Sequence, residues 1–467
     1  MISILSARIS VSYLIATLVF PALCGRANGL EAQSNSSEQS RHLIICVDGV
    51  GFSLIEKMRA GGRFRLFRQP AKMISPFPTL TNVSMTEILK PAGALAETPG
   101  YEESYFDAED NRLRGSLLDR FRSGRFIKGT FRELFDYHPS AIKSGLGYAA
   151  PPVTTYLESL TDVIRLHQKF NASREPVFFA YTGASDSLAH LGGERMLRSL
   201  LARLDDVVND IVRDSGGRVR VTIFSDHGNH FRSYKRVPLK EALARAGMRL
   251  EGRIRDERSV VLPQFGLVGC AVLFTREANE ARVAETVAGV RGVDFAVYES
   301  AGVVRIVSRG GRATIERRGQ SYRYRAETGD PLGVSAALDR LRAQGKTGED
   351  GFIADADWLA ATVAGERPDA VRRVYEGAIN HVRNRANVIV SLEDGYYYGS
   401  YMLDVFAFLQ ATHGNLGREQ SLGFVMQTGA ELPPYVRAEN LWETVGSPVL
   451  SRAAHAEAEK PNAPAGK

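Results

Sequence analysis

The chain has 467 residues, of which 44% are hydrophobic and 24% charged, a composition typical of globular proteins rather than disordered or fibrous ones. The formal net charge of +6 is small for this length, the arginines are scattered, and no zinc-finger spacing occurs. We therefore predict no specific nucleic-acid binding. The length allows one large core and a second, smaller unit.

The N-terminal segment has the parts of an export signal. Residues 1–8 carry one positive charge, residues 9–23 are mainly apolar, and small residues follow at 24–29. We predict a signal peptide over 1–29, a Ser-rich flexible leader over 30–40, and an exported protein, periplasmic or extracellular, without a transmembrane helix in the mature chain. Acylation of Cys24, as in a lipoprotein, is an alternative. Cys46 and Cys270 lie in apolar runs and are predicted to be buried free thiols.

Three short runs of apolar, β-branched or aromatic residues predict buried strands at 42–47, 177–181 and 219–224. Leucines and valines at helical spacing predict a long amphipathic helix over 194–214. Strands that alternate with helices indicate an α/β fold. We predict a doubly wound, mostly parallel sheet with helices on both faces.

The segment 232–384 has a different pattern, with a β-α-β-like stretch from 269 to 298 and hairpin-like runs at 303–307 and 322–324. We predict that it forms an inserted, smaller α+β cap. A further strand at 387–392 is expected to return the chain to the main sheet. The core then comprises 41–231 and 385–451, and residues 452–467 form a disordered tail.

The predicted strands end at acidic and histidine residues. Asp48 follows the first strand, Asp186 and His190 follow the second, and Asp226 and His227 follow the third. Because ligands bind beyond the carboxyl ends of parallel strands, these side chains are expected to converge in one crevice. Such oxygen and nitrogen donors hold zinc or manganese in sites that are left partly open. His413, in a Gly-rich loop, would add another imidazole.

These pieces together resemble the alkaline phosphatase superfamily and, within it, the type I phosphodiesterase and nucleotide pyrophosphatase branch. The matching pieces appear in family order over residues 43–424 and cover the core but not the cap; they are Ile45–Gly49, Phe77–Thr81, Asp186 with His190, Ser225–Gly228, and His413–Gly414.

The resemblance implies two divalent metal ions, with Zn²⁺ expected and manganese or iron fitting the same residues. One ion would be held by Asp186, His190 and His413, and the other by Asp48, Asp226, His227 and the side chain of Thr81. The resemblance also makes Thr81 the nucleophile of a hydrolase that cleaves phosphodiester or pyrophosphate bonds through a phosphothreonine intermediate. The substrate would be a small-molecule, lipid or glycan phosphoester.

The sequence departs from the family at two places. Asn82–Met85 follow the nucleophile where the branch has a Phe-Pro-Asn-His type of sequence, and residues 100–107 lack the Asn that commonly binds a phosphoryl oxygen. Asn82 is a candidate replacement, because it would lie at the start of a helix predicted over 83–89 and could serve as an oxyanion donor.

Several alternatives stay open at this stage. A phosphomonoesterase would share the core but need extra cationic donors, and a transferase could pass a phospho group to an envelope glycan or lipid. The complete ligand set argues against a non-enzymatic binding protein, and Thr81 at the nucleophile position argues against a sulfatase. Tyr396–Tyr398 are expected to pack as a strand edge, residues 309–325 to form a solvated hairpin, and His230 has no family role. The sequence predicts no particular oligomeric state.

Overall fold

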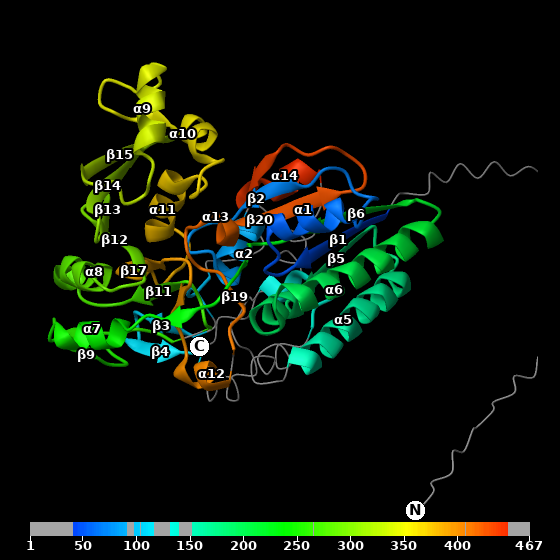
Figure 1. Cartoon of the computed structure of the whole chain (residues 1–467), viewed down its shortest axis with the longest axis horizontal. Helices are drawn as coiled ribbons and strands as arrows, with labels where there is room; N and C mark the ends of the chain where they lie inside the picture. The colour runs from blue at the N-terminus through cyan, green and yellow to red at the C-terminus, as the bar shows by residue number, and fades with distance from the viewer. Residues whose placement is uncertain are drawn as a thin grey trace, which may run out of the picture. The chain divides into compact units, whose positions relative to one another are not determined.

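A computed structural model describes residues 41–90, 98–102, 104–115, 131–139, 152–264, 266–406 and 408–446 (Figure 1). The predicted signal peptide, leader, Cys24 acylation and C-terminal tail lie outside these residues. In the described part of the chain, no helix combines the length and apolar character needed to cross a membrane. Cys46 and Cys270 are buried and free, as predicted.

The main sheet has six strands in the order β21-β2-β20-β6-β1-β5. Five strands run in one direction, and only β20 runs against its neighbours β6 and β2. The mostly parallel sheet is therefore confirmed, and the three strands predicted from the sequence, β6, β1 and β5, are neighbours at one end of it. The strands are β1 (Arg41–Val47), β2 (Ala71–Ile74), β5 (Val177–Thr182), β6 (Val219–Phe224), β20 (Leu422–Gln427) and β21 (Tyr435–Arg437).

Side chains of this sheet alternate between two apolar layers. In β1, Leu43 and Ile45 pack with helices α1, α5 and α6, whereas Ile44 and Cys46 pack with α2 and α14 on the other face. Helices thus cover both faces, which confirms the doubly wound arrangement. Their bounds are α1 (Phe52–Ala60), α2 (Thr81–Leu89), α5 (Pro152–Ala172), α6 (Ala184–Asp214) and α14 (Leu441–Val445).

Helix α6 begins ten residues before the predicted 194–214 helix. Gly193, at φ 69° and ψ −174°, is not helical, so it separates a short first segment from the predicted amphipathic one. The first segment carries Asp186 and His190, whose spacing of four residues places both side chains on one helix face. The sequence pattern missed this segment because its polar face is turned toward the site instead of solvent.

A second, seven-stranded antiparallel sheet has the order β11-β17-β12-β13-β14-β15-β16. Helices α7 and α8 contribute to the apolar layer on one face, and α9, α10 and α11 to the layer on the other. The 309–325 hairpin expected from the sequence is present as β14 and β15, but it is not solvated on both faces, because Ile315, Tyr322 and Tyr324 are at most 3% exposed in the core of the second sheet. The strands are β11 (Cys270–Leu273), β12 (Val293–Ser300), β13 (Val303–Ser308), β14 (Gly311–Arg318), β15 (Ser321–Thr328), β16 (Ile353–Ala354) and β17 (Val388–Leu392).

Five helices belong to the two layers that cover the second sheet, and four two-stranded pairs lie outside the two large sheets. The helices are α7 (Leu239–Arg245), α8 (Glu280–Ala288), α9 (Ser335–Ala343), α10 (Asp355–Thr362) and α11 (Ala370–Ile379). The pairs are β3 (Tyr105–Asp107) with β4 (Arg112–Arg114), β7 (His230–Phe231) with β19 (Ala411–Thr412), β8 (Lys235–Arg236) with β18 (Tyr396–Tyr397), and β9 (Arg249–Leu250) with β10 (Ser259–Val260). The short helices α12 (Tyr401–Phe406) and α13 (Arg418–Ser421) follow β17, the last strand of the second sheet, and precede β20 of the main sheet in the sequence.

One strand prediction was wrong. The run at 387–392 does not return the chain to the main sheet: as β17 it pairs with β11 and β12 in the second sheet. The chain rejoins the main sheet only at β20. A short β-branched run buried on both faces looks the same in any central strand, so its pattern cannot identify its partners. The division at 232 and 384 stays a prediction.

Helix α11 presses against the segment that leads to Thr81. A Cβ at Gly377 would lie 2.3 Å from the backbone oxygen of Phe77, so only a glycine allows this approach. One turn earlier, Arg373 donates from Nη2 to the backbone oxygen of Pro76 at 3.3 Å and to Ser421 Oγ at 2.8 Å. The second sheet's helix layer therefore fixes the backbone ahead of Thr81.

We expect Gly377→Ala to lower the free energy of unfolding by about 1–3 kcal/mol, because overpacking outweighs the better helix propensity of alanine. Urea denaturation measures this difference. Gly252→Ala is the control, since a Cβ there meets no atom within 4 Å, and it should leave stability nearly unchanged. Equal stability of both variants would show that α11 does not constrain the Phe77 backbone.

Candidate metal centre and nucleophile

Three neighbouring strands of the main sheet lead into the candidate ligands. Asp48 follows β1, Asp226 follows β6 after one residue, and Asp186 lies in the first turn of α6, directly after β5. The order β6-β1-β5 brings the three strand ends together, as the sequence predicted. Each carboxylate is at most 8% exposed. The three imidazoles expected to join them, His190, His227 and His413, are at most 4% exposed.

The first group consists of Asp48, Asp226 and His227. Their donor atoms lie within 4.8 Å of one another. The His227 Nε2 atom is 3.5 Å from Asp48 Oδ1 and 3.5 Å from Asp226 Oδ2. The structure thus brings together the three charged residues that the resemblance assigned to one ion.

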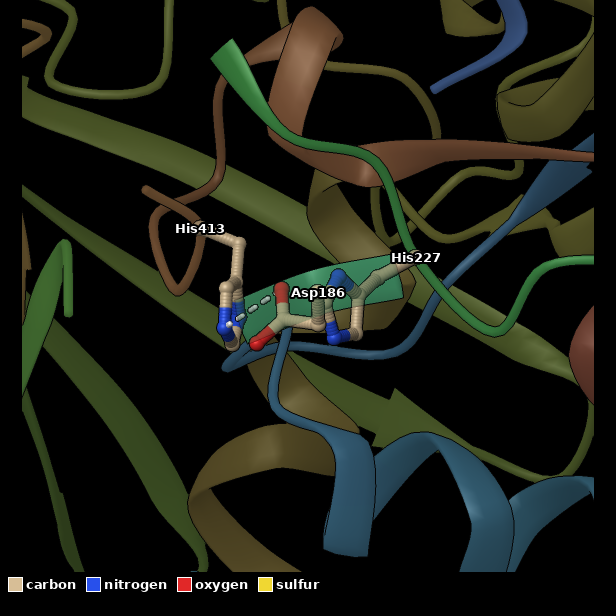
Figure 2. Close-up of side chains that lie close together, drawn as sticks. All are labelled: Asp186, His227 and His413. Atoms are coloured by element: carbon tan, nitrogen blue, oxygen red, sulfur yellow. Dashed lines mark ion pairs between the residues drawn. The ribbon is translucent and has the colours of Figure 1, made fainter. Parts of the chain in front are cut away.

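The second group consists of Asp186, His413 and His227, whose donor atoms also lie within 4.8 Å of one another (Figure 2). His413 Nε2 is 3.7 Å from Asp186 Oδ1, and the rings of His227 and His413 stack with centroids 3.9 Å apart. His190 contacts the other oxygen of Asp186, with Nε2 at 3.3 Å from Oδ2. His227 therefore lies within reach of both groups, a feature that the sequence did not predict.

Hydrogen bonds orient two of the imidazoles toward the carboxylates. Nδ1 of His413 lies 2.7 Å from the backbone oxygen of Thr79, and Nδ1 of His227 lies 3.0 Å from that of Gly228. Because a carbonyl oxygen only accepts, Nδ1 carries the proton in each contact. In a neutral ring, Nε2 then carries a lone pair that can bind a cation. Burial and the neighbouring His227 lower the pKa of His413 to about 3, so this ring is neutral at pH 7.

Burial and the neighbouring charges shift the pKa values of the three carboxylates in different directions. Burial, with the charges of Asp226 and Asp186, holds the pKa of Asp48 well above its ordinary value. Burial also raises the pKa of Asp226, although His227 partly offsets it. For Asp186 burial acts in the same direction, but His190 and His413 outweigh it and leave the pKa below its ordinary value.

The donor set fits divalent cations. A lone pair on His413 Nε2 faces Asp186, so two electron-rich atoms oppose each other across 3.7 Å. Asp226 Oδ2 is fully buried and has no hydrogen-bond partner among the described residues. A cation between such atoms would satisfy both, and mixed imidazole and carboxylate donors suit zinc, manganese or iron.

Thr81 lies against the first group. Its Oγ1 donates to Asp48 Oδ1 at 3.2 Å and is 3.2 Å from His227 Nε2. Thr81 is the first residue of α2, and Leu80, in the preceding position, makes no side-chain cap. The hydroxyl therefore faces the ligands rather than capping the helix. Asn82 is the second residue of α2, and its Nδ2 atom is buried without a hydrogen-bond partner among the described residues.

Two residues that the sequence did not single out contact the ligands. The Tyr181 hydroxyl, at the end of β5, donates to Asp48 Oδ2, which leaves Oδ1 to face Thr81. Asn229 donates to Asp186 Oδ1 at 2.9 Å. An aromatic residue inside a buried strand looks like core, so nothing in the pattern marks Tyr181. Asn229 directly follows the Ser225–Gly228 motif, and that position was its only signal.

Other residues noted in the sequence lie elsewhere. Tyr397 and Tyr398 are 7% and 1% exposed, which confirms that these two tyrosines are packed in the interior. His230 pairs with Asp394 at 3.2 Å between Nδ1 and Oδ2, not with the ligand groups.

Comparison with known proteins gives structural matches only. No protein-family model and no curated protein matches the sequence. Murine ectonucleotide pyrophosphatase/phosphodiesterase 5 matches with a TM-score of 0.47 and 11% identity, over 87% of this chain and 94% of that one. The human protein of the same name matches with a TM-score of 0.46 and 12% identity, over 87% of this chain and 93% of that one. Phosphonoacetate hydrolase from Sinorhizobium meliloti 1021, solved in complex with phosphonoformate, matches with a TM-score of 0.45 and 11% identity, over 90% of this chain and 96% of that one.

At TM-scores below 0.5, function has to be inferred from the residues of the site itself.

Proposed function

We propose that the chain is a metal-dependent phosphohydrolase that cleaves phosphodiester or pyrophosphate bonds with Thr81 as nucleophile. The observation that carries this proposal is the position of Thr81 Oγ1, which is 3.2 Å from both Asp48 Oδ1 and His227 Nε2 inside a buried donor cluster. A structural threonine would not need two potential metal ligands at its hydroxyl. The predicted export signal at residues 1–29 would place this activity outside the cytoplasm.

The proposed residues divide the work as follows. Asp48, Asp226, His227 and the Thr81 hydroxyl would hold one cation, and Asp186, His190 and His413 the other. Divalent cations in such a centre supply Lewis acidity, which favours the alkoxide form of a nearby hydroxyl and offsets phosphoryl charge. Asp48 Oδ1, which accepts a hydrogen bond from Thr81 Oγ1 at 3.2 Å, and His227 Nε2, 3.2 Å from the same oxygen, would hold the hydroxyl in place beside the cation.

The reaction would then proceed in two displacements at phosphorus. In the first, a bond forms from Thr81 Oγ1 to phosphorus while the bond to the leaving oxygen breaks, and that oxygen takes up a proton. In the second, a water oxygen attacks the same phosphorus, the bond to Oγ1 breaks, and Thr81 regains its proton. The α2 backbone amides and the buried Nδ2 of Asn82 are the candidate donors to the phosphoryl oxygens.

The charges around the centre favour a singly charged phosphodiester over a monoester dianion. The largest influences on the pKa values of Asp48, Asp186 and Asp226 come from burial, carboxylates, histidines, Tyr181 and a backbone amide, and no lysine or arginine is among them in the described residues. A monoester dianion would need such cationic donors, whereas a diester carries a single charge.

The test compares bis(p-nitrophenyl) phosphate with p-nitrophenyl phosphate, with Zn²⁺ or Mn²⁺ added or with EDTA. We expect metal-dependent turnover and a kcat/KM for the diester at least tenfold above that for the monoester. A preference for the monoester would reassign the protein as a phosphatase. No turnover of either compound by metal-loaded protein would count against hydrolysis and favour a transferase. The mass of the purified chain also reports whether residues 1–29 have been removed.

A further inference from the structure

A single buried amide ties together the three strand ends that carry the ligands. Asn229, which is 3% exposed, follows β6. Its Nδ2 atom donates to the backbone oxygen of Gly49, which follows β1, at 2.8 Å. The same nitrogen donates to Oδ1 of Asp186, which follows β5, at 2.9 Å. Since an amide nitrogen has two hydrogens, both donors are used and the side-chain orientation is fixed.

The backbone at Gly49 lies so close to Asp186 and Asn229 that no side chain fits at this position. Gly49 has a φ of +67°, and a Cβ there would lie 2.4 Å from Asp186 Oδ1 and 2.6 Å from Asn229 Nδ2. Glycine is therefore required both by the backbone conformation and by the close approach of these two side chains. The loop after β1, which holds Asp48, is thus pressed directly against the Asp186–Asn229 pair.

This position links the two ligand groups. Asp48, next to Gly49, belongs to the group with Asp226, whereas Asp186 belongs to the group with His413. Asn229 is neutral, so it brings hydrogen-bond donors to the space between the groups without adding charge to three buried carboxylates. A ligand carboxylate whose second partner is fixed in this way has a defined orientation toward its cation.

We propose that Asn229 is a positioning residue that fixes the two ligand groups relative to each other and so allows two cations to bind at the same time. The inference rests on the proposed two-cation centre, and it assigns a role to a residue outside the three aspartates and three histidines proposed as ligands. Asn229 acts through Asp186 and through the Gly49 backbone.

Two substitutions of nearly equal shape separate its contributions. Asn229→Leu removes both donated hydrogen bonds. Asn229→Asp keeps the shape but replaces Nδ2 by an oxygen, which would face Asp186 Oδ1 and the Gly49 oxygen, two acceptors that cannot donate to it. Asn279→Leu is the matched control, because Asn279 is 6% exposed and donates to the backbone oxygen of Glu257 at 2.6 Å, in a different part of the chain.

The experiment titrates Zn²⁺ into metal-free protein against a chromophoric chelator, which gives the number of bound ions and their stepwise affinities without an activity assay. We expect two ions per wild-type chain and per Asn279→Leu chain. In Asn229→Leu the dissociation constant of the weaker ion should rise at least tenfold, while the tighter ion changes less than threefold. Urea denaturation of the metal-free proteins shows whether each variant folds, and Asn229→Asp decides the question if the leucine variant does not.

The outcomes for the two proposals differ. Two ions bound with wild-type affinities in folded Asn229 variants would overturn the positioning role and leave the two-cation centre intact. A parallel tenfold loss for both ions would also overturn it, because a general loss of structure weakens both sites equally. Fewer than two ions in the wild-type chain would instead overturn the two-cation centre on which the proposed function depends.

Discussion

Replacing Thr81 with alanine is expected to lower kcat/KM for bis(p-nitrophenyl) phosphate by at least about 1000-fold, because the variant lacks the proposed nucleophile. Thr81→Ser keeps a hydroxyl at the same carbon and should retain activity within about tenfold of the wild type. Steady-state kinetics at saturating Zn²⁺ measures both variants. Acid-quenched wild-type protein, analysed by peptide mass spectrometry, should carry a phosphate on Thr81 that the alanine variant lacks.

The control for this experiment is Thr86→Ala on the same helix. Thr86 is 7% exposed, and its hydroxyl donates to the backbone oxygen of Asn82 at 2.7 Å. Its loss removes a buried hydroxyl from α2 without touching the ligand groups, so activity should stay within about threefold of the wild type. A Thr81→Ala enzyme within tenfold of the wild type would exclude Thr81 as the nucleophile, whatever the control shows.

Removal of divalent cations is expected to abolish turnover and to lower the unfolding temperature, with both restored by Zn²⁺ or Mn²⁺. The physical reason is that Asp48, Asp186 and Asp226 are buried close together and repel one another when no cation neutralises them. A cation present at 100 times its dissociation constant stabilises the folded chain by about 2.7 kcal/mol. Differential scanning calorimetry with EDTA and with added metal measures the effect.

Asp226→Asn makes this prediction sharper. Asp226 is fully buried, its Oδ1 accepts from the Gly49 amide at 3.2 Å, and an asparagine oxygen can keep that bond while the negative charge is lost. We expect the metal-free variant to be more stable than the metal-free wild type, and Zn²⁺ to stabilise it much less. The substitution would thus raise the stability of the metal-free protein and lower that of the zinc-bound protein. A packing defect would instead destabilise both.

The matched control replaces a buried carboxylate outside the centre. Asp205 on α6 is 4% exposed, and burial raises its pKa as it does for Asp226. Asp205→Asn should leave the stabilisation by Zn²⁺ unchanged. If EDTA does not alter the unfolding temperature of the wild type, or if Asp205→Asn loses the response to zinc as fully as Asp226→Asn, the carboxylate cluster is not a cation site.

The convergence of the candidate ligands was predictable because its signals are local in sequence. Each of Asp48, Asp186 and Asp226 follows a run that reads as a buried strand, and the rule for parallel strand ends predicts their convergence without knowledge of the partners. His413 lies in a Gly-rich loop that follows no predicted strand, so the sequence marked it only as a further imidazole, and the family resemblance assigned it to an ion. The sharing of His227 between the two groups depends on distances of a few ångströms between loops, which no pattern contains.

By itself, the sequence determined the strands β1, β5 and β6, the amphipathic part of α6 that packs against them, and the residues at the strand ends, because apolar runs and helical periodicity are properties of neighbouring residues. Only the tertiary structure decided that β17 pairs with β11 and β12, that β20 runs against the main sheet, and that Gly377 closes on Phe77. The contacts of Tyr181 and Asn229 with the candidate ligands were also decided only by the tertiary structure. Their roles come from contacts with residues 133 and 43 or more positions away, and hydrophobic patterning specifies which face of an element is buried but not what it meets.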